Sequence, residues 1–258
     1  MNGQSLSIEV IESTHFLTIN RPESDNKLNI PFMTELVRVL KAAETDQSCR
    51  VVVLTASGKY FCNGGELGDF RIKSPLQIRE FGEAFIDLHT AIHTLSKPVI
   101  AAIQGHVMGG GFSLVEACDL AVASEDALFG VPEIRSGLAP MMALTGVSRV
   151  FSRKKLMEMA LLGEVISAAE AKQIGLVNRV CPKERVIDEA LKIAGQLKMN
   201  NPTAIALCKK LYRDLDCLPY ERQLEAGLSM LVVLLKSEDA AEALTANEEH
   251  RLPDWKGR

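Results

Sequence analysis

Two short apolar runs in the first half of the chain are each followed by a cluster of glycines. Residues 51–55 (Val-Val-Val-Leu-Thr) precede Gly64 and Gly65, and residues 99–103 (Val-Ile-Ala-Ala-Ile) precede the glycine triplet 109–111. Apolar, β-branched runs of this length are typical of parallel strands that are covered on both faces. Because parallel strands end at the same edge of a sheet, the sequence predicts that both glycine clusters lie together at a ligand-binding edge.

Extended and helical patterns alternate along this part of the chain. Strands are expected at residues 6–10 and 15–20, and apolar residues recur at helical spacing over 31–44 and 76–95. A strand then starts at Val99, directly after Lys-Pro. This alternation predicts an α/β fold with largely parallel strand pairing.

After Pro140 the strand pattern nearly disappears and helical spacing dominates. Ser167 and Glu170 have the spacing of a capping box, which favours a helix start at that point. The expected helices cover residues 152–162, 168–173, 183–198, 202–212, 219–235 and 237–247. We therefore expect an α/β core over residues 1–200 and a helical C-terminal region over residues 201–258.

The helix expected over residues 219–235 carries a very apolar stripe. The stripe consists of Leu224, Leu228, Leu231, Val232 and Leu235. Two interpretations remain open at this point. The stripe either packs on the core of its own chain or is buried against another subunit.

Backbone amides and one acidic side chain are the candidate chemical groups. If one N–H from each glycine loop points to a common centre, the pair forms an oxyanion hole. The alternative is that these glycines only permit tight turns. Glu133 lies among Phe129, Val131, Pro132 and Ile134, so burial is expected to raise its pKa. Alternatively, its carboxylate caps a turn or pairs with Arg135.

Composition argues against several classes of function. The net charge of −4 gives no basic surface for nucleic acid or for an acidic membrane, and no apolar run approaches the roughly 20 residues that span a bilayer. The six cysteines are scattered, and no signal-peptide pattern opens the sequence, so we expect reduced thiols and a cytoplasmic location. No metal site is expected. His89 and His93 lie four residues apart on one expected helix without a third ligand, and we expect them to pack.

Several motifs together resemble those of the crotonase superfamily, also called the enoyl-CoA hydratase/isomerase family. The resemblance covers residues 6–256 and so nearly the whole chain. It rests on Asn-Arg-Pro at 20–22, Phe-Cys-Asn-Gly-Gly-Glu-Leu at 61–67, the glycine triplet at 109–111, Cys-Asp-Leu-Ala-Val-Ala at 118–123, Phe-Gly-Val-Pro-Glu-Ile at 129–134 and Pro-Asp-Trp-Lys-Gly at 253–257.

The resemblance implies a fold, a substrate and site residues. The fold would be a spiral of β-β-α units with a C-terminal helical region that forms trimers, often paired into hexamers. The substrate would be a coenzyme A (CoA) thioester, with no separate cofactor. Gly65 and Gly110 match the two positions whose amides hold the thioester oxygen. The positions implied for binding CoA and substrate are Lys27, Leu28, Asn63, Gly64 and Gly109, of which Lys27 is also a candidate contact for a CoA phosphate.

One departure from the family pattern bears on the reaction. Hydratases of this family use two glutamates; Glu133 matches the second, but Ser113 stands where the first would be. A single glutamate resembles the Δ3-Δ2-enoyl-CoA isomerases, in which one base removes the C2 proton and returns it at C4. Residues 138–144 (Leu-Ala-Pro-Met-Met-Ala-Leu) are also bulkier and more apolar than the stretch Ile-Pro-Gly-Ala-Gly-Gly of the hydratases. This suggests an acyl-binding wall with less room for a catalytic water.

We therefore expect an enoyl-CoA isomerase in which Glu133 carries the proton and Ser113 is part of the catalytic set. The alternatives are a hydratase in which Ser113 and Glu133 share a water, an enolate-forming decarboxylase, and an acyl-CoA-binding protein with weak catalysis. Glu116, one turn beyond Ser113, is expected to be structural.

Overall fold

The computed structural model describes residues 5–148, 150–215 and 218–258 of the chain. Its larger sheet has six strands in the order β1-β2-β3-β5-β7-β10. β1 (Leu6–Ile11) and β2 (Thr14–Ile19) form an antiparallel hairpin. The other strands continue the sheet in parallel, and they are β3 (Val51–Ala56), β5 (Val99–Ile103), β7 (Leu120–Ser124) and β10 (Arg179–Cys181).

The strands that directly follow β3, β5 and β7 along the chain belong to a second, smaller sheet of four strands. Its order is β4 (Tyr60–Asn63), β6 (His106–Met108), β8 (Leu128–Gly130) and β9 (Val165–Ser167). Each of the pairs β3-β4, β5-β6 and β7-β8 is followed by a helix. The chain therefore winds as a spiral of β-β-α units, which confirms the fold class expected from the resemblance.

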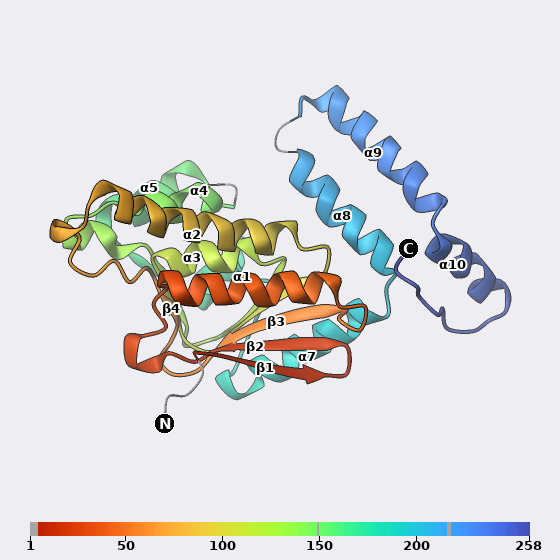
Figure 1. The fold of residues 1–258 in the computed structure, drawn as a ribbon, viewed down its shortest axis with the longest axis horizontal. Coiled ribbons are helices and arrows are strands. Elements are labelled where there is room, and N and C mark those ends of the chain that lie inside the picture. Colours follow the sequence, from red (N-terminus) through yellow and green to blue (C-terminus); the bar gives the residue numbers. More distant parts are fainter. Residues whose placement is uncertain (1–4, 149, 216–217) are drawn as a thin grey trace.

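Helices cover both faces of the larger sheet. α1 (Ile30–Thr45) and α2 (Pro75–Thr94) lie on one side and α7 (Val186–Lys198) lies on the other, as Figure 1 shows. Along β3, Val52 and Leu54 belong to the core beneath α1 and α2, whereas Val51 and Val53 pack with α7. Every residue of β3 is buried, so the prediction of a strand covered on both faces is confirmed.

The helices expected after Pro140 are confirmed. They are α5 (Arg153–Leu162), α6 (Ala168–Gln173), α7, α8 (Pro202–Leu215), α9 (Tyr220–Leu235) and α10 (Glu238–Glu248). Ser167 accepts the Glu170 amide at 3.2 Å as predicted, but Glu170 pairs with Lys155 at 2.7 Å. Ser74 and Gln77 instead form a complete capping box at the start of α2.

Some secondary structure after Pro140 was not predicted from the sequence. β9 and β10 follow Pro140, and so does a helix that the sequence did not indicate, α4 (Met141–Val147). Strands of three residues are too short to show a periodic pattern. Ile78, one of the apolar residues at helical spacing in the segment 76–95, is 45% exposed, because it lies in the first turn of α2, ahead of the buried residues of that helix.

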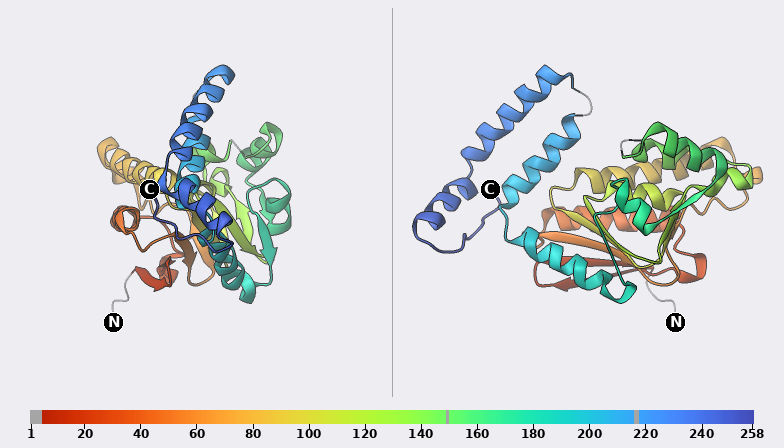
Figure 2. Two further views of the ribbon diagram at one scale, coloured as in Figure 1. Left: turned by 90° about the vertical axis from the view of Figure 1, so that its right-hand side faces the viewer. Right: turned by 180° about the vertical axis from the view of Figure 1, so that it is seen from behind.

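The C-terminal helices project from the body of the molecule (Figures 1 and 2). α9 packs beside α8, but its apolar stripe is open, with Leu224 60%, Leu228 63% and Leu235 65% exposed. Of the two interpretations of this stripe, packing on the core of its own chain is therefore wrong. A large exposed apolar face is typical of a protein–protein contact.

Two sets of polar contacts hold the base of this helical region in place. Lys209 of α8 bonds the Asp119 carboxylate at 2.5 Å and the Lys97 carbonyl at 2.9 Å. Asp239, which is fully buried, accepts the Thr203 hydroxyl at 2.7 Å and the Lys256 amide at 2.6 Å. Buried charges need such partners, so the base of the helical region is held firmly. No helix in the described ranges combines the length and apolar character needed to cross a bilayer.

Candidate active site

Three neighbouring parallel strands of the smaller sheet end side by side at the candidate site. Asn63 of β4 is in register with Met108 of β6, and Met108 is in register with Gly130 of β8. The glycine loops therefore follow β4 and β6, rather than β3 and β5 as the sequence suggested. Glu133 follows β8 at the same edge. The prediction that both glycine clusters meet at one sheet edge is confirmed.

The two glycine loops touch each other. A Cβ atom placed on Gly64 would lie 3.4 Å from the Gly110 nitrogen, and one placed on Gly109 would lie 3.4 Å from the Gly64 Cα. Gly64 has φ +81° and Gly109 has φ +55°. Side chains are disfavoured at these angles, so glycine is required for the close approach of the loops.

The backbone amides of Gly65 and Gly110 each belong to a peptide unit whose carbonyl already accepts a hydrogen bond. The Gly64 carbonyl accepts the Leu28 amide at 2.8 Å, and the Gly109 carbonyl accepts the Phe112 amide at 2.9 Å. In a trans peptide the N–H points away from the C=O, so the Gly65 and Gly110 amides are directed away from these partners. Neither amide donates to another group within the described residues.

Two unpartnered amides in contacting loops are the groups from which an oxyanion hole can be built. Gly110 is also the first residue of α3 (Gly110–Ala117), where the positive end of the helix dipole favours a negative ligand.

Glu133 lies against these loops. It sits in the short helix η3 (Pro132–Ser136), and its Oε1 would be 2.8 Å from a Cβ on Gly109. Its Oε2 is buried and has no hydrogen-bond partner among the described residues. Burial raises the pKa of this carboxyl. Arg135 packs against Gly163 instead, so the alternative of an ion pair with Arg135 is not realised.

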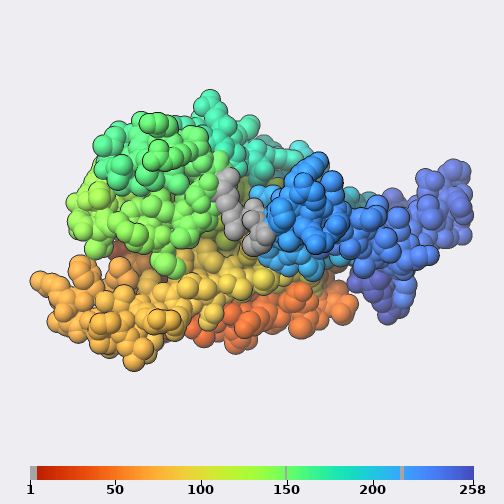
Figure 3. All heavy atoms as spheres, turned by 90° about the horizontal axis from the view of Figure 1, so that it is seen from above, coloured from red at the N-terminus to blue at the C-terminus, as the bar shows by residue number. Residues whose placement is uncertain are grey.

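Ser113 points toward α2. Its Oγ is 3.1 Å from His89 Nε2 and 3.1 Å from the Gly110 carbonyl oxygen, and the residue is 1% exposed. Ser113 and His89 line a cavity of about 260 Å³ between α2, α3 and α4. Figure 3 looks onto the face where α2 (orange to yellow) runs beside α4 and α5 (green). Glu116 lies against Gly146 of α4.

The segment next to the glycine loops that is implied for CoA binding, residues 26–29, is held by a network of hydrogen bonds. Leu28 is fully buried, and its carbonyl accepts the Glu66 amide at 2.7 Å. Glu66 in turn accepts Arg21 at 2.7 Å and Asn29 at 3.0 Å, and Arg21 also donates to the Lys27 carbonyl. Sequence reasoning did not find this network, although the Asn-Arg-Pro motif contained its central residue.

Asn63 and Lys27 differ in how tightly they are held. The Asn63 side chain donates to the Asp25 carboxylate at 3.3 Å, and the Asn63 backbone N–H donates to the Asp25 backbone carbonyl at 3.2 Å. Lys27 is half-buried at the edge of the same segment. The structure thus brings Lys27, Leu28 and Asn63 beside Gly64.

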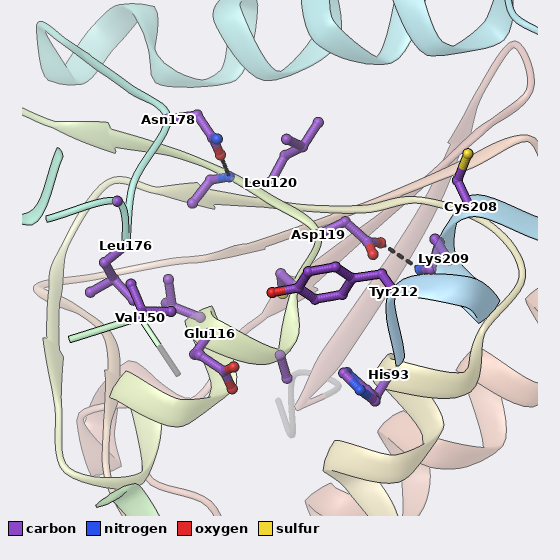
Figure 4. Close-up of a pocket in the computed structure, with 15 residues that line it drawn as sticks. His93, Glu116, Asp119, Leu120, Val150, Leu176, Asn178, Cys208, Lys209 and Tyr212 are labelled. Atoms are coloured by element: carbon purple, nitrogen blue, oxygen red, sulfur yellow. Dashed lines mark hydrogen bonds and ion pairs between the residues drawn. The ribbon is translucent and has the colours of Figure 1, made fainter. Parts of the chain in front are cut away.

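A larger cavity of about 430 Å³ lies at the base of α8 (Figure 4). It is lined by side chains that include His93, Tyr212 and the Asp119–Lys209 ion pair. None of the predicted site residues lines it. This cavity marks the junction of the helical region with the core, and the two glycine loops and Glu133 lie elsewhere.

The sequence model for "Enoyl-CoA hydratase/isomerase" matches residues 9–258. The chain belongs to the enoyl-CoA hydratase/isomerase family. It is 34% identical to 2,3-dehydroadipyl-CoA hydratase of Escherichia coli over 94% of both chains. It is 33% identical to carnitinyl-CoA dehydratase of Proteus mirabilis over 99% of this chain and all of that one.

Solved structures agree with the family assignment. An enoyl-CoA hydratase of Mycobacterium smegmatis superposes with a TM-score of 0.93 at 32% identity, covering 98% of this chain and 99% of that one. The crotonase resemblance is thereby confirmed, and the family member is an enzyme of the hydratase/isomerase type.

Proposed function

We propose that this family member is an enoyl-CoA isomerase that moves a double bond from position 3 to position 2 of an acyl-CoA. The Gly65 and Gly110 amides hold the thioester oxygen while Glu133 removes a proton from C2. The resulting dienolate takes the same proton back at C4. The observation that carries this proposal is the buried Glu133 Oε2, which has no hydrogen-bond partner among the described residues, beside two backbone amides that donate to no described group.

Two features of the site support this chemistry. Each oxyanion donor is worth about 3–4 kcal/mol of transition-state stabilisation, and burial tunes a glutamate toward proton exchange near neutral pH. The reaction neither oxidises nor reduces the substrate, so we expect no cofactor besides the CoA that the substrate carries. We infer that residues 26–29, together with Asn63, hold that CoA moiety.

A second candidate, hydration of 2-enoyl-CoA, is favoured by the names of the relatives. A panel of CoA thioesters with mass detection separates the possibilities. Isomerisation leaves the mass unchanged, hydration adds one water, and decarboxylation removes carbon dioxide. Binding without turnover would indicate a catalytically weak acyl-CoA-binding protein. No conversion of 3-enoyl-CoA at any chain length would contradict the isomerase proposal.

The pH dependence of isomerisation tests the role of Glu133. Only the carboxylate can remove the C2 proton, so kcat/KM is expected to rise with pH through the pKa of Glu133. Because burial raises that pKa, the midpoint is expected above the usual glutamate value of about 4.3. Initial rates with a 3-enoyl-CoA between pH 4 and pH 9 measure it. A rate that stays flat over this range would argue against a glutamate base.

We also propose that the chain forms trimers, or hexamers of two trimers, through its helical C-terminal region. The exposed stripe of α9 is the feature that supports this. Changing Leu228 to Glu places a charge within the stripe and is expected to shift the chain to monomers, as measured by light scattering. Lys236→Glu, at the C-terminal end of the same helix and outside the stripe, is the matched control. An unchanged mass for the Leu228 variant would place the contact elsewhere.

A cytoplasmic location remains our proposal for this enzyme. Cys49, Cys62 and Cys118 are buried free thiols, and burial raises the pKa of each. A raised pKa makes a thiol less reactive, and buried cysteines that are not paired in disulfides are typical of proteins in a reducing compartment.

A further inference from the structure

Two phenyl rings of α2 lie against the two glycines of the candidate oxyanion hole. A Cβ atom placed on Gly65 would be 2.8 Å from the Phe81 ring, and one placed on Gly110 would be 2.9 Å from the Phe85 ring. Phe81 and Phe85 are four residues apart and therefore lie on the same face of the helix. In the proposed function the two glycine amides hold the thioester oxygen, so the first carbons of the acyl chain lie close to these rings.

Phe85 also borders a cavity on the far side from the glycine loops. The cavity of about 260 Å³ between α2, α3 and α4 is lined by Phe85, Ser113 and Met142, among others. Of the described residues, neither Gly110 nor Phe81 lines it. Ser113 Oγ is 3.1 Å from the Gly110 carbonyl oxygen. Phe85 and Ser113 thus separate the Gly110 loop from the cavity, and Phe85 is the larger of the two.

The Phe85 ring is fixed in this position. The residue is 4% exposed, and the imidazole of His89 stacks on the ring at 4.0 Å between centroids. His89 is itself held, with Nδ1 2.9 Å from the Phe85 carbonyl oxygen and Nε2 3.1 Å from Ser113 Oγ. Because the ring is packed between Gly110 and this imidazole, it cannot turn aside without breaking these contacts. The cavity is therefore closed off from Gly110.

The cavity is suited to an apolar chain. The Ser113 hydroxyl donates to the Gly110 carbonyl, and the Thr145 hydroxyl donates to the Met142 carbonyl at 2.9 Å. Both ring nitrogens of His89 are engaged as well. Polar groups that already have partners do not require water beside them. The volume far exceeds the roughly 30 Å³ that one water takes up in the liquid, so several methylene groups have room there.

We propose that Phe85 determines the length of the acyl chain that this enzyme accepts. The substrates are short acyl-CoA thioesters, whose chains end at the Phe85 ring. Longer chains are excluded from the cavity by that ring, and a smaller side chain at this position would admit them. The inference rests on the proposed function in one respect, because it places the thioester oxygen at the Gly65 and Gly110 amides.

The decisive experiment measures binding of saturated acyl-CoA thioesters by calorimetry. The wild type is expected to bind butyryl-CoA and decanoyl-CoA with dissociation constants within about threefold of each other, because the additional carbons stay in water. Phe85→Ala is expected to bind decanoyl-CoA at least about tenfold more tightly than the wild type does, since burial of two methylene groups is enough for this effect. Saturated thioesters have no double bond to move, so the result does not depend on isomerisation.

Three further variants make the test specific. Phe81→Ala removes the other ring of α2 without opening the cavity, and it is expected to keep the wild-type ratio of the two dissociation constants. Phe85→Leu is a smaller change in the core, serves if the alanine variant fails to fold, and is expected to shift the ratio in the same direction. Adding Met142→Trp to Phe85→Ala refills the cavity and is expected to remove the gain. Thermal melting shows whether each variant is folded.

The outcomes separate this inference from the proposed function. Wild-type binding of decanoyl-CoA more than tenfold tighter than that of butyryl-CoA overturns the inference, since the chain then bypasses Phe85. Unchanged binding of decanoyl-CoA in folded Phe85 variants also overturns it, as does a gain that survives Met142→Trp. Hydration in place of isomerisation rejects the isomerase and leaves the binding result standing. If neither thioester binds the wild type, both proposals are rejected.

Discussion

Replacing Glu133 by Gln is expected to abolish double-bond isomerisation, with kcat about 10²- to 10⁴-fold lower. The amide keeps the size and shape of the side chain but cannot accept the C2 proton. Binding of the CoA thioester is expected to change little, because Gly65 and Gly110 are untouched. Stopped-flow or steady-state rates with a 3-enoyl-CoA, together with calorimetric binding, measure the two effects separately.

Thermal unfolding distinguishes lost chemistry from lost structure. Burial raises the pKa of Glu133, so the folded chain binds this proton more tightly than the unfolded chain. The stability from this group is therefore present at low pH and lost as the pH rises through the folded pKa. Glu133→Gln is expected to melt at a higher temperature than the wild type above that pKa.

A surface carboxylate provides the control for this substitution. Glu125 is exposed beside the start of β8, and Glu125→Gln is expected to match the wild type in rate and in melting temperature. Activity above one tenth of wild type in Glu133→Gln would remove this glutamate from the mechanism.

Gly109→Ala is expected to lower kcat/KM at least about 10²-fold, because a displacement of about 1 Å at a catalytic group has an effect of this size. The new methyl would lie 2.8 Å from Glu133 Oε1 and 3.4 Å from the Gly64 Cα. It would push the base away and part the two oxyanion loops. The backbone at φ +55° adds strain of about 1–3 kcal/mol.

Gly175→Ala is the matched control for backbone strain. Gly175 also has a positive φ, of +88°, but a Cβ there would meet no atom within 4 Å. This variant is expected to lose about 1 kcal/mol of stability and to keep its activity. If the two alanine variants had equal rates, crowding at Gly109 would not control the geometry of the site.

The larger sheet was predictable because its central strands have five or six residues each and are mostly apolar. Both β3 and β5 read as buried strands, and the amphipathic spacing of α1 marked the helix that covers them. The second sheet was not visible, since β6 and β8 have three residues each. Their existence depends on pairing between distant segments, which local sequence does not encode.

The candidate site was predictable in its composition but not in its supports. The glycine pairs and Glu133 had local signals, namely the φ values that glycine allows and an apolar neighbourhood. The pairing of His89 with Ser113 had none, because it depends on how α2 crosses α3. The contact made by Leu28 also had no local signal. The Leu28 backbone N–H donates to the Gly64 carbonyl and so orients the peptide between Gly64 and Gly65.

The central strand of the smaller sheet has a consequence for folding. β6 pairs with β4 on one side and β8 on the other, and each of the three strands ends in one part of the site. No stretch of the chain that stops before β8 contains both candidate amides, of Gly65 and Gly110, together with Glu133. Pairing of such widely separated segments has a high loop-closure cost and is slow. Recovery of turnover during refolding therefore reports late, cooperative assembly of the whole spiral rather than the formation of any single unit.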